Sequence, residues 1–280
     1  MDYLARRRDR VEERLEAVLG DVEPTELREE LRHVGLGGGK RVRPVVTVLV
    51  CEALAGDVDD ALDFAAGIEL VHNASLVVDD VIDESPVRRG TPAAWAEFGH
   101  GPAIIASDGL IGEAFALFST DERAMQAVSE AMVELGEGEA TELVAHPEEE
   151  AEYMALARRK TGALFRAAAE LGAIAADADG YTVESLGRYA ERVGVAFQIR
   201  DDVLDATADA ADLGKPVGQD AALERPSFVE VTGRSPAAAT DRAREEAAAA
   251  LDALESVDAR DSQAMVYLRD LAEFVVERDR

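Results

Sequence analysis

Apolar residues recur at helical spacing along most of the chain, and this pattern restricts the fold more than any other feature of the sequence. In the segment 261–278, for example, Met265, Leu268, Leu271 and Val275 fall on one face of a helix. Strand-like alternation of apolar and polar residues does not recur, and the sequence shows neither a hairpin signal nor a fixed-period repeat. The sequence therefore predicts an all-α fold, a large bundle of helices.

Short breaks separate the predicted helices, and glycine and proline mark these corners. The expected helices cover 5–33 with a break near 21–24, 44–55, 59–84, 101–118, 121–145, 148–175, 181–207, 237–256 and 261–278. The second of these segments is rich in valine and threonine, so a strand is the alternative there. No shift in composition marks a linker, and residues 1–280 are expected to form a single domain.

The chain is strongly acidic, with 58 acidic and 29 basic residues and a formal net charge of −29. Nucleic acid and anionic membrane surfaces are poor partners for such a protein, because both carry negative charge. Salt screens the self-repulsion of so many like charges. The charge therefore indicates a halophilic protein from a salt-rich cytoplasm, with an ordinary acidic protein as the alternative.

The N-terminus mixes arginine and glutamate from its start and shows no signal-peptide pattern. No segment approaches the ~18 uncharged apolar residues of a membrane span. A cytoplasmic protein that is not an integral membrane protein is therefore expected. Cys51 is the single cysteine, so an internal disulfide is impossible, and we interpret it as a small buried apolar residue.

Two acidic strings carry the clearest functional signal. DDVID spans Asp79–Asp83 and DDVLD spans Asp201–Asp205, each after an apolar helical stretch. Residues four apart share one face of a helix, so the outer carboxylates of each string project together. Carboxylates clustered in an apolar setting repel one another, and Mg²⁺ is the natural cation because it prefers oxygen ligands shared with substrate phosphates. Two solvated acidic helix ends are the alternative.

Lysine is rare, and each copy lies in a distinctive string. The three lysines are Lys40 in GGGKRVRP, Lys160 in RRKTGALF and Lys215 in DLGKPVGQD, whereas the other basic residues are arginine. Three compact ammonium groups and two acidic strings suit anionic substrates that are held through metal. Accidental survival of the three lysines is the alternative.

Five strings, taken in chain order, resemble the trans-polyprenyl diphosphate synthase family, which includes geranylgeranyl diphosphate synthases. The strings are GGKRVRP, HNASLVVDDVIDESPVRRG, RRKTGALF, FQIRDDVLD and GKPVGQD, and they extend from Gly38 to about Asp220. The resemblance implies an isoprenoid synthase-like bundle around a central apolar cavity. It also implies a Mg²⁺-dependent prenyltransferase that joins isopentenyl diphosphate head to tail to an allylic diphosphate and releases diphosphate.

The resemblance assigns a role to each matching residue. The residues implied to bind Mg²⁺ are Asp79, Asp83 and Asp201, with Asp80, Asp202 and Asp205 as nearby ligands or supporting residues. The residues implied to bind the diphosphate of isopentenyl diphosphate are Lys40, Arg43, His72 and Arg89, and Arg88 is implied to contact the allylic diphosphate. The residues implied to surround the allylic diphosphate and the cation that it leaves are Lys160, Thr161, Gln198 and Lys215.

Two small residues, Ala74 and Ser75, lie one turn before the first aspartate pair, where members with short products often have an aromatic residue. In the family this turn forms part of the cavity floor. Small side chains there imply a deep cavity and a product of about twenty carbons or more. Phe115 and Phe118 on a later helix are candidates to cap the cavity.

The chain also departs from the family pattern. Glu139 stands where the family usually has glutamine, Ser107 where it has glycine, and Arg225 in the region where a further lysine is usual. A non-catalytic modulatory subunit of a prenyl synthase, a class I terpene cyclase and an acidic interaction protein are the competing interpretations. A homodimer is implied by the resemblance alone.

Overall fold

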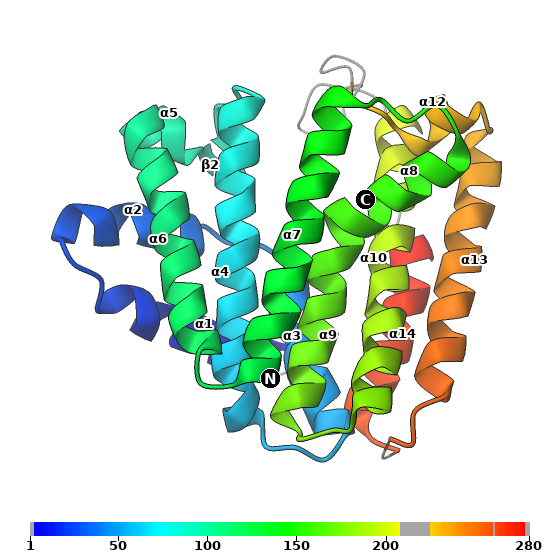
Figure 1. Ribbon diagram of the computed structural model, residues 1–280, viewed down its shortest axis with the longest axis horizontal. Helices are drawn as coiled ribbons and strands as arrows, with labels where there is room; N and C mark the ends of the chain where they lie inside the picture. The colour runs from blue at the N-terminus through cyan, green and yellow to red at the C-terminus, as the bar shows by residue number, and fades with distance from the viewer. Residues whose placement is uncertain (1–2, 208–224, 260, 278–280) are drawn as a thin grey trace.

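The computed structural model describes residues 3–207, 225–259 and 261–277, and these fold into a bundle of helices, as predicted (Figure 1). The helices, in chain order, are α1 (Tyr3–Gly20), α2 (Thr25–Gly35), α3 (Val42–Ala53), α4 (Val58–Ile82), α5 (Ala94–Phe98), α6 (His100–Phe118), α7 (Glu122–Val144), α8 (Glu150–Ala157), α9 (Ala163–Ala175), α10 (Gly180–Thr207), α12 (Phe228–Thr232), α13 (Pro236–Glu255) and α14 (Gln263–Glu277). Helix α3 covers residues 42–53, so the strand alternative for 44–55 is wrong.

A π-helical turn, η1 (Arg158–Gly162), joins α8 to α9, so the segment predicted as one helix over 148–175 consists of three pieces. The π turn widens the helix at RRKTG. Such turns are found frequently at functional sites. Hydrophobic periodicity did not reveal it, because one turn of altered pitch barely changes the pattern of buried residues.

A small hairpin between α4 and α5 was not predicted. Strands β1 (Val87–Arg88) and β2 (Thr91–Pro92) pair antiparallel across a two-residue turn. Both turn residues have positive φ, 52° at Arg89 and 81° at Gly90. Such turns favour Asn-Gly or Asp-Gly. An Arg-Gly turn with two-residue strands therefore gives no recognisable hairpin signal.

Helix α4 lies at the centre of the bundle, with α6 on one side and α3, α9 and α10 on the other (Figure 1). Its middle is buried almost without interruption, which explains why its apolar residues surround the helix. The C-terminal ends of α4, α7 and α10 lie at the same end of the bundle (Figure 1). The two acidic strings therefore belong to one end of the fold.

Small residues allow the core helices to approach closely, as the shortage of aromatic residues requires. The hydroxyl of Thr47 on α3 donates to the carbonyl of Ala168 on α9 over 2.8 Å. One turn further along α9, a Cβ atom added to Gly172 would lie 2.3 Å from the carbonyl oxygen of Thr47. Backbone thus meets backbone at this crossing, and no larger residue fits there.

Two helices, α4 and α6, are long and apolar enough to match a membrane span by composition. Most of the apolar window of α4 is buried inside the bundle, at 67%, and the α6 window is 39% buried. Burial in the bundle explains the apolar composition of α4 without a membrane. The outer face of α6 is more exposed.

Replacement of Gly172 by alanine is expected to lower the free energy of unfolding by about 1–3 kcal/mol, because the added methyl group must separate α3 from α9. Urea denaturation at constant KCl measures this. Gly20→Ala is the control, since an added Cβ at Gly20 meets nothing within 4 Å. The control should be neutral or stabilising by about 0.4–1 kcal/mol. Equal effects of the two changes would contradict the close crossing.

Candidate active site

A cleft of about 410 Å³ opens between α3, α4, α10 and the π turn. Most of the residues singled out in the sequence line it, namely Lys40, Arg43, His72, Arg88, Arg89, Lys160, Thr161, Gln198, Asp201 and Asp202. Asp79, Asp80 and Asp83 are not among its lining residues: Asp83 is linked to it through Arg225, and Asp80 lines a smaller pocket with Arg88 and Arg89. Asp205 lies one turn beyond Asp201 on α10 and does not line the cleft. Lys215 lies outside the described residues.

The loop before α3 is held by a buried ion pair. The guanidinium of Arg41 donates to Glu69 on α4 and to Glu12 on α1, each over 2.7 Å, and to the carbonyl of Gly35 over 2.8 Å. Arg41 and Glu69 are each 2% exposed. Losing one partner of such a buried pair is strongly destabilising, so the pair fixes the loop. The neighbours Lys40 and Arg43 are thereby directed into the cleft.

Arg43 is a partly buried cation with a donor that no described residue accepts. Its guanidinium lies 4.6 Å from the centre of the Phe165 ring, and its Nε is buried without a hydrogen-bond partner among the described residues. Burial lowers the pKa of Arg43 to about 10, so the side chain still carries its charge at neutral pH. An orphaned buried N–H is costly. An anionic ligand in the cleft would satisfy it.

His72 lies among arginines. Burial lowers its pKa well below the usual value, and the positive charges of Arg43, Arg89 and Arg88 lower it further. The imidazole is therefore neutral at pH 7. A neutral imidazole can donate one hydrogen bond to an anion, but its remaining N–H is not acidic at this pH.

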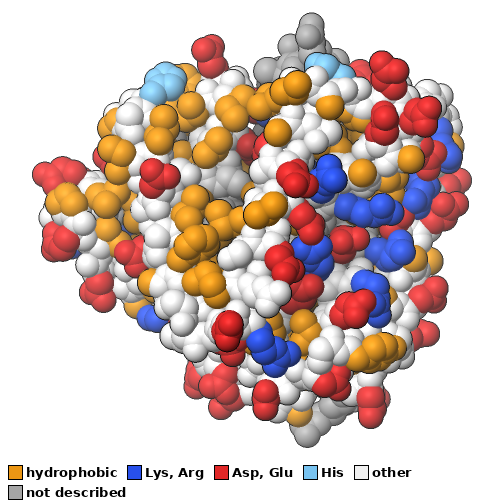
Figure 2. Space-filling view, viewed as in Figure 1, with side chains coloured by type: hydrophobic (Ala, Val, Ile, Leu, Met, Phe, Trp, Pro, Cys, Tyr) orange, Lys and Arg blue, Asp and Glu red, His pale blue; other side chains and the backbone are white. Residues whose placement is uncertain are grey.

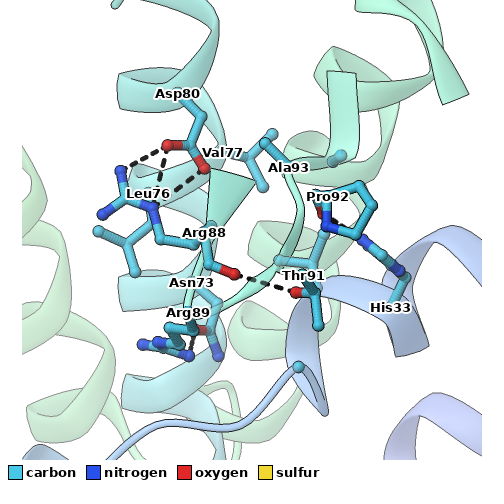
Figure 3. Close-up of a pocket in the computed structure, with 13 residues that line it drawn as sticks. His33, Asn73, Leu76, Val77, Asp80, Arg88, Arg89, Thr91, Pro92 and Ala93 are labelled. Atoms are coloured by element: carbon cyan, nitrogen blue, oxygen red, sulfur yellow. Dashed lines mark hydrogen bonds and ion pairs between the residues drawn. The ribbon is translucent and has the colours of Figure 1, made fainter. Parts of the chain in front are cut away.

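The hairpin presents two arginines to the cleft, and α4 anchors both (Figure 3). Nε of Arg88 donates to the two carboxylate oxygens of Asp80 over 2.9 and 3.1 Å. Nη1 of Arg89 donates to Gly38 O over 2.5 Å and to Asn73 Oδ1 over 3.3 Å. Asp80 is 3% exposed and faces Arg88. Its observed contact is thus with an arginine, and its proposed part in metal binding stays a prediction.

The opposite wall carries Lys160 on the π turn. Its ammonium contacts Glu142 and lies 3.3 Å from Glu139, both on α7. Burial alone would lower the pKa of Lys160, but the two carboxylates raise it, so the ammonium is charged. A Cβ added to Gly138 would lie 2.9 Å from the backbone nitrogen of Lys160. Glycine at 138 therefore lets α7 bring both carboxylates against the π turn.

Asp202 organises the floor of the cleft. It accepts hydrogen bonds from the Tyr153 hydroxyl, from Gln198 Nε2 over 2.9 Å and from the backbone N–H of Phe228 over 2.6 Å. The Thr161 hydroxyl donates in turn to Gln198 Oε1 over 2.7 Å. Asp202 is 2% exposed. It fixes the orientation of Gln198 and, through it, of Thr161.

The first aspartate string faces cations from the other side of the cleft. Arg225 contacts Asp83, and its Nε lies 3.8 Å from Glu142. Burial, and to a smaller degree the charge of Glu139, raise the pKa of Asp79 to about 7, although Lys160, Arg225 and Arg88 act in the opposite direction. Among the described residues none of these cations forms an ion pair with Asp79, so the effect of burial dominates.

The donor set fits Mg²⁺ when a diphosphate completes the coordination. Within the described ranges, no group of three or more His, Cys, Asp or Glu side chains stands close enough to hold a metal alone. Mg²⁺ is commonly bound through one or two carboxylates together with substrate phosphates and water. Asp83 already attracts a cation, the guanidinium of Arg225. Asp79 and Asp83 are therefore suited to a cation shared with a ligand.

The fold is a helical bundle, and its cleft is lined by cations and carboxylates. These features indicate a class of protein that binds anionic substrates. The chain matches the model of the polyprenyl synthetase family over residues 24–265. It therefore belongs to that family, and it is a prenyltransferase.

The similarity of this chain to named synthases supports its assignment to this family. The short chain isoprenyl diphosphate synthase of Methanothermobacter thermautotrophicus is 35% identical over 253 residues, which are 87% of this chain and 78% of the relative. The geranylgeranyl pyrophosphate synthase of Geoglobus acetivorans is 33% identical, with 96% of each chain covered. The crystal structure of the geranylgeranyl pyrophosphate synthetase of Pyrococcus horikoshii superposes with a TM-score of 0.89 at 33% identity, covering 98% of this chain and 97% of that one.

Sequence reasoning missed several residues that build the cleft, namely Arg41, Glu69 and Glu142. A signal was present for Glu69, since a lone glutamate within the apolar stretch AAGIELV must be paired once it is buried. Glu142 gave no comparable signal. It lies on a helix that carries many exposed acidic residues.

The raised pKa of Asp79 predicts a pH-dependent cost to the ligand-free protein. Between its ordinary value, 3.8, and about 7, the folded state keeps a proton that the unfolded state has lost. The free energy of unfolding therefore falls as pH rises through this interval. The Asp79→Asn variant has no carboxyl that titrates here, so its free energy of unfolding does not fall in this way. In EDTA it should be more stable than the parent at pH 8, and the difference should shrink toward pH 4.

Denaturant titrations at pH 5 and pH 8 measure the difference. Asp252→Asn, at an exposed position on α13, removes the same charge and should follow the parent at both pH values. Parallel pH profiles for Asp79→Asn and the parent would contradict the burial of the Asp79 carboxyl.

Proposed function

We propose that this chain condenses isopentenyl diphosphate with an allylic diphosphate, head to tail, to form a trans-polyprenyl diphosphate and release diphosphate. One observation carries the proposal. Cations gather around one cleft, some in ion pairs and some without a partner among the described residues, and both acidic helix ends approach this cleft. The named relatives with this fold, a geranylgeranyl pyrophosphate synthase and a short chain isoprenyl diphosphate synthase, support the same chemistry.

The cationic wall suits the diphosphate of isopentenyl diphosphate. Arg43 offers a buried Nε donor, and Lys40 lies beside it with its ammonium exposed. Arg89 extends from the hairpin, and the neutral His72 donates a hydrogen bond without adding charge. Fixed donors in a largely buried cleft bind a phosphate more strongly than the same groups in water. Because Arg41 and Asn73 hold these groups in place, little rearrangement is needed on binding.

The opposite wall suits the allylic substrate. Lys160 and Arg88 would contact its diphosphate, while Thr161 and Gln198 lie close together where the allylic carbon would be placed. Mg²⁺, held by Asp79, Asp83 and Asp201 with Asp80, Asp202 and Asp205 nearby, would stabilise the negative charge that builds up on departing diphosphate. Oriented oxygens of Thr161 and Gln198 would stabilise the allylic cation. Exclusion of water by the surrounding helices protects that cation from hydrolysis.

The proton lost after condensation needs an acceptor, and the released diphosphate is proposed for this role. His72, the only histidine that lines the cleft in the described part of the chain, is surrounded by arginines. A positive charge on this ring, beside those of the arginines, would be strongly disfavoured. The side chain therefore acts as a donor rather than as the base.

The product is proposed to have about twenty carbons or more, because small residues lie below the first aspartate string. Ala74 is buried, and Ser75 hydrogen-bonds the backbone of its own helix. Further down α4, Phe118 packs against Gly67, where an added Cβ would lie 2.6 Å from the ring. Gly67 lies twelve residues before Asp79, about 18 Å along the helix. A cavity that followed α4 over this length would end at Phe118, which is proposed to cap it; Phe115 is less buried.

Enzymatic elongation tests the proposal directly. With labelled isopentenyl diphosphate, Mg²⁺ and high KCl, the protein should extend ten- or fifteen-carbon allylic diphosphates to twenty carbons or more. Asp79→Ala and Lys215→Ala should lower kcat by at least about 100-fold, because each removes charge that stabilises the leaving diphosphate. Asp252→Ala is the charge-matched control for the aspartate. Product that stops at fifteen carbons would overturn the proposed depth, and absence of elongation by folded protein would overturn the proposed activity.

We further propose that the chain forms a homodimer through α6 and α7. Figure 2 shows hydrophobic side chains gathered over these two helices. The exposed apolar residues there are Ile104, Ile105, Val133, Leu143 and Val144, each at least half exposed. Exposed apolar patches of this kind mark protein–protein contact sites.

Light scattering after size-exclusion chromatography tests the assembly. Val133→Glu should shift the protein from dimer to monomer, because it places a charge in an apolar interface. Tyr181→Glu, at an equally exposed position on α10, should leave the mass unchanged. A parent protein that is monomeric at micromolar concentration would contradict the homodimer.

A further inference from the structure

Arg225 lies between two acidic elements that no other single side chain joins in the described part of the chain. Its guanidinium contacts Asp83 at the end of α4, and its Nε is 3.8 Å from Glu142 on α7. All three side chains are largely buried, with 20%, 10% and 9% of their surface exposed. Arg225 also lines the cleft, so its position is one that a bound ligand would reach.

The environment requires a positive charge at this place. Glu142 is paired with Lys160, and Asp79 lies near Glu139, so among the described residues carboxylates outnumber cations around the C-terminal end of α4. A buried carboxylate without a counter-ion is strongly disfavoured. Arginine keeps its proton at every physiological pH, so it cannot relieve a conflict with another cation by becoming neutral.

We propose that Arg225 is an internal counter-cation that occupies Asp83 in the ligand-free protein and competes there with a divalent cation. When a diphosphate enters with the cation, its oxygens offer the guanidinium a new partner within the same cleft. Arg225 then moves from the carboxylate to the diphosphate, while Asp83 is released for the metal. The inference rests on the proposed function, because it takes the first aspartate string to be the metal site.

Two consequences follow from this exchange. Metal alone must displace a guanidinium from Asp83, so binding of metal without diphosphate is weakened. Binding of diphosphate removes that competitor, and the two ligands therefore favour each other beyond their direct contact. Lysine at this position would provide the charge without the planar fork that can contact carboxylate and diphosphate bidentately.

Binding of Mn²⁺ alone, followed by electron paramagnetic resonance, tests the competition without any turnover. Arg225→Gln should bind Mn²⁺ at least about five-fold more tightly than the parent, since it removes one ion-pair competitor. Arg234→Gln removes the same charge at the exposed pair with Glu150 and should leave Mn²⁺ binding unchanged. All titrations use one KCl concentration, because screening alters weak cation binding. Equal or weaker Mn²⁺ binding by Arg225→Gln would overturn the proposal.

Thermal stability provides a second readout. In EDTA, Arg225→Gln should melt below the parent, because Asp83 loses its counter-ion, and saturating Mg²⁺ should raise its melting temperature by more than that of the parent. If the glutamine variant does not fold, Arg225→Lys replaces it and should show a smaller gain in Mn²⁺ affinity. An Mn²⁺ affinity of Arg225→Lys equal to that of the parent would then contradict the proposal.

The variants Asp79→Ala and Asp83→Ala separate failure of this inference from failure of the proposed function. If they lose Mn²⁺ binding while Arg225→Gln behaves as the parent, the first aspartate string binds metal and only the counter-cation role is wrong. If they bind Mn²⁺ as the parent does, the string is not the metal site, and both proposals fall.

Discussion

The pairing of buried carboxylates with cations is the interaction on which the rest of the structure depends. A bundle of this size supplies an apolar interior, and a charged group there is strongly stabilised by a partner of opposite sign. Arg41 with Glu69 fixes the loop before α3, Asp80 orients Arg88, and Glu142 holds Lys160. These pairs place positive groups around one cleft and keep them in position. The apolar helices supply the shape of the site, and the ion pairs supply its chemistry.

Most of the fold could be predicted from the sequence, because long helices carry a strong periodic signal. The limits of α4, α7 and α10 agree with the predicted ranges to within a few residues. The features that were missed are short or local. The π turn at 158–162 changes only the pitch of one turn, the hairpin has an Arg-Gly turn, and α5 and α12 are too short to show periodicity. Each depends on tertiary packing rather than on local preference.

The site was predictable to a different degree for different residues. Residues in the distinctive strings, such as Lys40 and Lys160, were found because rare residue types in unusual patterns stand out against the acidic background. Their partners were not, because a glutamate such as Glu142 is unremarkable in a chain with 58 acidic residues. Spacing also could not show that Asp80 forms an ion pair with an arginine while Asp79 forms none with the described residues. Residues next to each other on a helix point in different directions, and only the tertiary structure determines which groups surround each of them.

The claim that the acidic helix ends bind cations jointly with diphosphate is tested most directly by anomalous diffraction. Crystals grown with Mn²⁺, isopentenyl diphosphate and an unreactive allylic diphosphate analogue would reveal each metal by its anomalous signal. Peaks are expected between the diphosphate oxygens and the carboxylates of Asp79, Asp83 and Asp201, with the guanidinium of Arg225 on the diphosphate. Diphosphates bound in the cleft with no metal at either aspartate string, or metals bound only elsewhere on the acidic surface, would contradict it.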